Sequence, residues 1–174
     1  DAINLIYWKL DSTGALIETQ SMAMPSAVIP NAISVEANLI TVAGTAYANP
    51  GNNGFIVSWN GKPTFLGKNA TQIHAISKMS DGSFIVVGQS ADKLLNTTLK
   101  GKVDGFLAKY MNGKFTTVQR SSEIKANRAW RSATSNLLLG GNVNSVAAIT
   151  KFGTNLQPIW TDRYPSTGSA LTAS

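Results

Sequence analysis

Residues able to support catalysis are few and scattered along this chain. His74 is the only histidine, cysteine is absent, and the nine acidic residues form no Asp-x-Asp-x-Asp loop and no close pair. A catalytic triad or a zinc site needs several such groups together, and a calcium loop needs clustered carboxylates. We therefore interpret His74 as a structural strand residue. The sequence predicts no catalytic residue, no metal site and no cofactor, so we expect that the protein is not an enzyme.

Aromatic and basic side chains are the better candidates for binding. Tryptophan can stack on a sugar ring or anchor a protein interface, although in sheet proteins it often packs between sheets. Trp59 recurs at an equivalent place in a repeat, which favours the core. Trp130 departs from that repeat and lies among arginines, so both exposure and burial remain open for it. The candidate binding residues are Tyr7, Trp8, Arg128, Trp130 and Arg131.

The positive charge of the chain is uneven. The net charge is +6, and eight of the fifteen basic residues lie between Lys100 and Arg131. Such a stretch could meet phosphate, an anionic glycan or an acidic partner. We favour a solvated face in which some lysines protect strand edges. No nucleic-acid partner is expected.

Composition is informative about location. Charged residues make up only 14% of the chain, below the ~25% typical of soluble domains, and Ser, Thr, Asn and Gly take their place. No apolar run reaches the ~18 residues needed to span a bilayer, so we expect no membrane span. The start at Asp1 fits a removed leader, an excised fragment or a longer chain. We expect a secreted, periplasmic or cell-surface protein.

The elements that would position these residues are strands. Short Val-, Ile-, Leu- and Phe-rich runs alternate with Gly, Asn, Asp and Pro, and no helical pattern occurs. Four runs recur in a fixed order. The first is short: 31–35, 72–77 and 124–129. The second ends on Gly44, Gly88 and Gly140, the third closes on Trp59, Tyr110 and Phe152, and the fourth follows a tight turn such as Asn112-Gly113.

The spacing of these runs predicts the architecture. Leu10, Trp59, Tyr110 and Phe152 are 49, 51 and 42 residues apart, and four strands in about 40–50 residues is the period of a β-propeller blade. We predict an all-β fold, a β-propeller segment of about three and a half four-stranded blades in one domain, 1–174. Its parts are a half blade at 1–24, blades at about 25–68, 69–120 and 121–165, and a tail at 166–174.

The amino-acid sequence of the repeat resembles that of a known family. Asp104-Gly-Phe-Leu-Ala-Lys-Tyr110, followed by Asn112-Gly113 and preceded by a strand ending on glycine, is similar to the bacterial SBBP-type β-propeller repeat. The similarity is strong in the unit from about Gln72 to Gln119. Elsewhere Ser58-Trp59 replaces the usual Lys-Tyr, and the family's Asp at the end of the first strand is absent. The resemblance implies a propeller of surface or extracellular type and implies no activity.

An incomplete first blade has a functional consequence. The unit at 1–24 contains only a third and a fourth strand, so we expect a protein partner or a second copy to complete the propeller. Two copies of three and a half blades would make seven. The leading hypothesis is a non-catalytic binding or assembly module, a structural subunit of a larger extracellular or surface complex. The alternatives are a carbohydrate-binding propeller, with a glycan as ligand, and a fragment of a larger propeller hydrolase.

Overall fold

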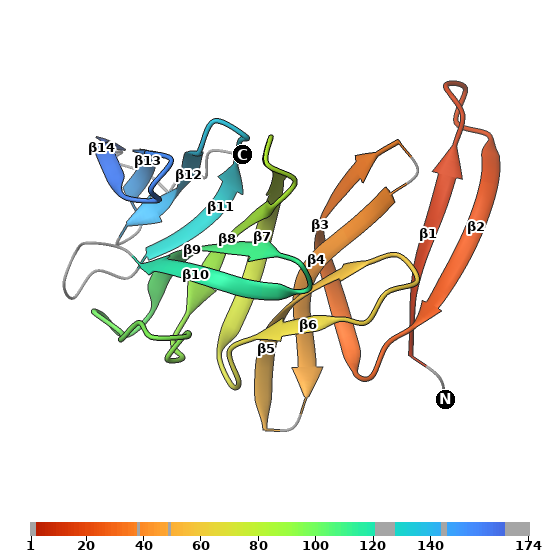
Figure 1. The fold of residues 1–174 in the computed structure, drawn as a ribbon, viewed down its shortest axis with the longest axis horizontal. Helices are drawn as coiled ribbons and strands as arrows, with labels where there is room; N and C mark the ends of the chain where they lie inside the picture. The colour runs from red at the N-terminus through yellow and green to blue at the C-terminus, as the bar shows by residue number, and fades with distance from the viewer. Residues whose placement is uncertain (1–2, 38, 49, 121–127, 144–145, 166–174) are drawn as a thin grey trace.

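The computed structural model describes residues 3–37, 39–48, 50–120, 128–143 and 146–165. The predicted all-β class is confirmed, because every regular element in this part of the chain is a strand (Figure 1). The strands are β1 (Asn4–Leu10), β2 (Leu16–Ala23), β3 (Ala27–Glu36), β4 (Leu39–Ala48), β5 (Gly51–Ser58), β6 (Thr64–Leu66), β7 (Thr71–Lys78), β8 (Phe84–Ser90), β9 (Asp104–Met111), β10 (Lys114–Arg120), β11 (Arg128–Ala133), β12 (Leu138–Val143), β13 (Val146–Phe152) and β14 (Pro158–Tyr164).

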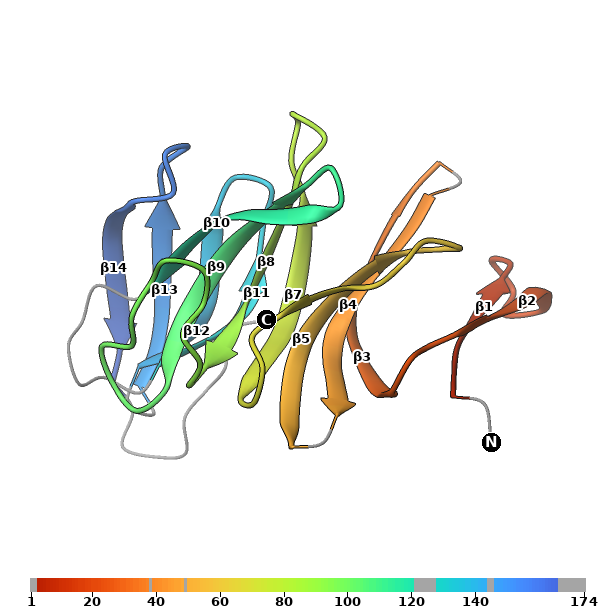
Figure 2. The same ribbon diagram turned by 60° about the horizontal axis from the view of Figure 1, so that its bottom comes forward.

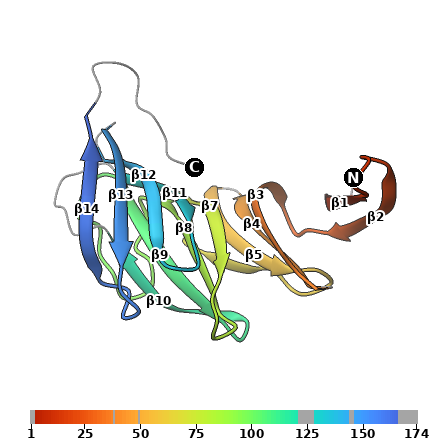
Figure 3. The same cartoon turned by 90° about the horizontal axis from the view of Figure 1, so that it is seen from above.

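The strands form four antiparallel sheets in chain order. The pair β1–β2 is followed by three four-stranded meanders, β3–β6, β7–β10 and β11–β14. Within a four-stranded sheet we call the first two strands the first-half hairpin and the last two the second-half hairpin. Figure 2 shows the sheets side by side, and Figure 3 shows them following one another along an open arc with β14 and the β1–β2 pair at its ends.

Burial on both faces explains the continuous apolar runs. In β8, Phe84 and Val86 pack toward the preceding sheet, whereas Ile85 and Val87 pack toward the following one. Alternating side chains of one strand point to opposite faces, so a strand between two sheets must be apolar throughout. Three apolar clusters therefore lie between successive sheets.

A bulge opposite a glycine recurs in every first-half hairpin. Gly44 pairs with Pro30 and Gly88 with Ile73, and in both hairpins the register of the first strand shifts immediately after that residue. A Cβ at Gly44 would lie 2.1 Å from the carbonyl oxygen of Ile29, and one at Gly88 would lie 1.9 Å from that of Gln72. Backbone atoms cannot yield by so much, so the bulge requires glycine.

The register corrects one expected equivalence. In the last sheet the shift follows Trp130, and the residue opposite Trp130 is Gly141. Gly141, and not Gly140, is therefore the counterpart of Gly44 and Gly88. The first strand of this sheet is described from Arg128 onward, and residues 124–127 of the predicted run lie outside the described part of the chain.

A second bulge fixes the identity of β1 and β2. Tyr110 pairs with Phe115 and Phe152 with Pro158, and in each pair the register shifts at the next residue of the fourth strand. Leu10 pairs with Leu16 and has the same shift. The β1–β2 pair is thus a second-half hairpin, and Leu10 is the counterpart of Tyr110 and Phe152.

Candidate functional site

The outer face of β1–β2 is an exposed apolar surface. We call it the leading face and define it by Ile6, Trp8, Leu10 and Leu16, which share one side of the hairpin by their pairing. Each of them is more than half exposed, and Trp8 is 69% exposed. An apolar strand face of this kind is costly to leave in water and marks an interaction surface.

The counterparts of Ile6 and Trp8 are buried in every complete sheet. Ile6 lies four residues before Leu10, just as Phe106 lies four before Tyr110 and Ala148 four before Phe152, so these three residues are counterparts. Phe55 joins them, because it pairs with Gly44 as Phe106 pairs with Gly88. Phe55, Phe106 and Ala148 are all 0% exposed. The counterparts of Trp8 are likewise inaccessible: Val57, Ala108 and Thr150. The leading face thus occupies positions that a neighbouring sheet covers elsewhere.

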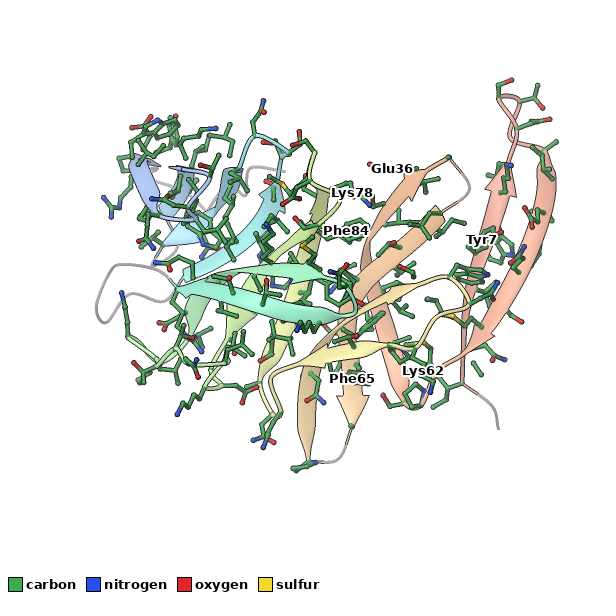
Figure 4. The ribbon with its side chains drawn as sticks, viewed as in Figure 1. Tyr7, Glu36, Lys62, Phe65, Lys78 and Phe84 are labelled. Carbon is green, nitrogen blue, oxygen red and sulfur yellow. The ribbon has the colours of Figure 1, made fainter. Side chains whose placement is uncertain are left out.

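The opposite side of this hairpin is already occupied. Leu5 packs with Phe55 and Val57 of the next sheet, and the Tyr7 ring meets the Trp59 ring edge-on at a centroid distance of 4.5 Å. Figure 4 marks Tyr7 on this incomplete sheet. Burial and the Glu18 carboxylate raise the pKa of the Tyr7 hydroxyl. Tyr7 is half-buried and packs toward the chain's own interior, on the opposite side of the hairpin from Trp8.

A groove borders the leading face. It has a volume of ≈ 380 Å³ and lies between β1–β2 and the β3–β4 end of the next sheet. Trp8, Lys9 and Glu18 line one wall, and Ile33 and Val35 line the other. Trp59 Nε1 donates to Gln20 Oε1 at 2.6 Å and holds the two sheets together beside the groove. An aromatic ring with charged groups on either side offers both stacking and polar contacts to a ligand.

The structure corrects the choice of Trp130 as a candidate binding residue. It is 1% exposed and meets Phe152 edge-on at 6.3 Å, inside the apolar cluster between the last two sheets. The flanking arginines left exposure open, but the Trp130 ring packs between the last two sheets, whereas Arg131 occupies the extra position of the bulge and is exposed. Trp130 is not available as a surface contact. Arg128 is the first residue of β11, and its side chain lies outside what the structure describes.

Arg131 meets the only histidine. One of its guanidinium nitrogens lies 2.9 Å from Nε2 and 3.3 Å from Nδ1 of His74, across the boundary between β7 and β11. His74 and Arg131 each occupy the extra position of a bulge. Burial and the Arg131 charge lower the pKa of His74 to about 4, while a hydrogen bond with Gln89 partly offsets them. A neutral imidazole beside a guanidinium is a polar contact between sheets.

A buried ion pair went unrecognised in the sequence. Arg120 NH1 lies 3.4 Å from Asp104 Oδ2, and both side chains are inaccessible to solvent. Asp104 also accepts backbone N–H bonds from Lys100 and Gly101, and Arg120 Nε donates to Thr97 at 2.9 Å. The pair therefore organises the segment between β8 and β9. Asp104 is the first residue of the repeat motif in its strongest copy, and this position was the one sequence feature that could have pointed to a structural role for it.

A further pair of contacts joins neighbouring sheets at one end. Lys78 Nζ lies 4.3 Å from the centre of the Phe84 ring and 4.0 Å from Glu36 Oε2. Figure 4 shows Glu36, Lys78 and Phe84 close together. These side chains belong to β3, β7 and the start of β8, so the contact is structural.

Among the described residues, no three His, Cys, Asp or Glu side chains come close enough to hold a metal ion. The same part of the chain contains no helix that is long and apolar enough to cross a membrane. Comparison of the sequence with protein-family models and with curated proteins found no match.

Proposed function

We propose that this chain is a β-propeller segment that acts as a non-catalytic assembly module, a structural subunit of a larger extracellular or surface complex. Three four-stranded meanders and a half sheet, each packed against the next, support this proposal. The observation that carries it is the exposure of Ile6 and Trp8 at positions that are fully buried in every complete sheet. A surface built like a core interface is expected to find a partner.

The other end of the array supports the same proposal. We call the outer side of β11–β14 the trailing face; the pairing places Leu138, Ile149, Trp160 and Tyr164 on it. Leu138 and Ile149 are the counterparts of Ile85 and Leu107, which are buried against the next sheet. Trp160 and Tyr164 are exposed. Each end of the array therefore presents the type of face that the other end could cover.

Two copies of this chain would not combine into a ring of seven complete sheets. Two copies would supply two second-half hairpins, β1–β2 from each, and these cannot complete one sheet together. The expected sum of three and a half plus three and a half blades therefore does not yield seven complete sheets. Face-to-face stacking of leading and trailing faces needs no such completion.

The test is the mass of the native protein in solution. We expect the full chain to self-associate at micromolar concentration, measured by sedimentation velocity, and Trp8→Ser to shift it toward monomer. Phe65→Ser is the matched control, because Phe65 is an exposed aromatic residue on β6 away from both faces. A stable monomer that is indifferent to Trp8→Ser would contradict the proposal.

Carbohydrate binding is the second candidate, and the groove beside Trp8 favours it. The groove holds an exposed indole next to Lys9 and Glu18. A glycan array with the native chain and with Trp8→Ala tests this candidate. Retained signal in Trp8→Ala would remove the groove as a sugar site, and loss in Phe65→Ala as well would indicate nonspecific binding.

A further inference from the structure

The free edge of β1 has a defined missing neighbour. In the part of the chain that the structure describes, β1 pairs only with β2, whereas β5, β9 and β13 each pair on both sides. Because β1 is a third strand by its bulge register, the missing neighbour is a second strand. Alternate N–H and C=O groups of β1 point toward this open edge.

The register of that neighbour can be read from the complete sheets. A glycine of the second strand lies opposite Phe55, Phe106 and Ala148 in the three sheets. Ile6 is their counterpart on β1. A strand docked on β1 in the same way would place glycine opposite Ile6 and would place the residue two positions earlier opposite Trp8.

The glycine also indicates that the partner of the β1 edge is a hairpin and not a single strand. It is required because the first strand bulges and brings a backbone carbonyl to within 2.1 Å of the Cβ position at Gly44 and 1.9 Å at Gly88. A glycine-bearing second strand therefore comes with its bulged first strand. The unit that fits the edge is a first-half hairpin.

A second copy of this chain is a poor source of that hairpin. Its three first-half hairpins, β3–β4, β7–β8 and β11–β12, are each paired inside their own sheets. Each has buried side chains in the apolar clusters, so releasing one would unfold a sheet. The donor must present a hairpin that is not already paired.

We propose that the β1 edge is a docking site for a first-half β-hairpin that residues 1–174 do not supply, paired antiparallel to β1 with glycine opposite Ile6. This inference rests on the proposed function, because it uses the same repeat equivalence, and it names the partner chemistry. The main-chain bonds of strand addition would supply affinity. The bulge-and-glycine pattern would supply specificity.

The chain itself provides the probe. A synthetic peptide of residues 71–90 reproduces β7 and β8 with their turn, in which Asp81 accepts the backbone N–H of Ser83 at 2.9 Å. In the proposed register its Gly88 lies opposite Ile6, its Val86 opposite Trp8 and its Phe84 opposite Leu10. A peptide of residues 104–120 is the control, because it reproduces the second-half hairpin β9–β10.

The absence of cysteine from the sequence allows a disulfide to report the register. The full chain with Trp8→Cys is mixed with the 71–90 peptide carrying Val86→Cys, under a glutathione redox buffer. Directly opposed residues of an antiparallel pair are close enough to form a disulfide. We expect a yield at least about tenfold above that of the peptide carrying Val87→Cys, whose side chain points to the other face.

Hydrogen exchange of the native full chain gives the second readout. The 71–90 peptide should slow, by about tenfold or more, the β1 amides that point away from β2, and the 104–120 peptide should leave them unchanged. Equal protection by both peptides, or by neither, would overturn the proposal. Protection of these β1 amides without peptide would also overturn the proposal, because the edge would then already be covered by the chain itself or by a second copy.

The two proposals fail differently. If the assembly module is wrong, sedimentation shows a monomer that is indifferent to Trp8→Ser. If only the hairpin site is wrong, the chain still associates through its faces while the open amides of β1 exchange freely and the register-matched disulfide does not form.

Discussion

At the scale of single residues, environment decides what each polar group does. Asp104 and Arg120 are inaccessible and bonded to each other and to the 91–103 segment. Burial lowers the pKa of Arg120, and the Asp104 charge opposes this shift. Removal of one partner of such a buried pair destabilises the fold, because the other charge is left buried without compensation.

Arg120→Met should therefore be strongly destabilising. We expect a loss of about 3–5 kcal/mol in the free energy of unfolding, measured by urea denaturation. The double variant Asp104→Leu with Arg120→Met should lose less than Arg120→Met alone, because no buried charge remains. Lys109→Met is the control, since its partner Asp81 is solvent-exposed, and it should have a much smaller effect. Equal losses in Arg120→Met and Lys109→Met would show that burial of the pair is unimportant.

His74 predicts a dependence of stability on pH. Its folded pKa of about 4 lies below the unfolded value of about 6.5, so the unfolded state binds the proton more readily between these values. The free energy of unfolding should be highest above about pH 6.5 and fall as the pH decreases toward about 4. Thermal melts across this range measure it. In His74→Gln this part of the pH dependence should disappear, and an unchanged profile would exclude His74 as its source.

At the scale of elements, bulges determine which residues are possible. The repeating glycines are needed where a bulged neighbour brings its carbonyl against them, and the same bulges define which strand of a sheet each segment is. Spacing alone placed the third glycine at position 140. The register places it at 141, because the bulge of β11 follows Trp130 and Trp130 pairs with Gly141.

Gly88→Ala tests the bulge. The new Cβ would meet the Gln72 carbonyl oxygen at 1.9 Å, so we expect a loss of about 1–3 kcal/mol or more. Gly82→Ala is the comparison variant, because Gly82 has a φ of +82° and no atom within 4 Å of its Cβ position. Its loss reports backbone conformation alone, about 1–2 kcal/mol. Chemical denaturation compares them, and a neutral Gly88→Ala would refute the steric argument.

At the scale of the whole molecule, the ends of the array differ from its interior. Interior sheets bury both faces, whereas the leading and trailing faces have one side uncovered in the described part of the chain. Association that covers both faces together would be head-to-tail, with the same contact repeated between successive copies.

Trp160→Ser distinguishes a head-to-tail contact from a symmetric one. Trp160 lies on the trailing face, at the opposite end of the array from Trp8. In a head-to-tail contact both substitutions should weaken association by a similar factor, measured by sedimentation equilibrium. If Trp8→Ser dissociates the assembly and Trp160→Ser does not, two leading faces meet each other.

The sequence by itself determined the all-β class, the order of strands and their grouping, because alternation, turn residues and a repeat period are local properties of the chain. It also predicts that 1–24 holds the last two strands of a repeat, and the register shift of β1–β2 is the one found in β9–β10 and β13–β14. Three features depended on the tertiary structure. Trp130 is buried and Tyr7 turns inward because the phase of a strand relative to its neighbour decides which face a side chain occupies. The Asp104–Arg120 pair joins residues sixteen apart through a sheet register. The leading face is recognisable only because the sheets that follow show what normally covers it.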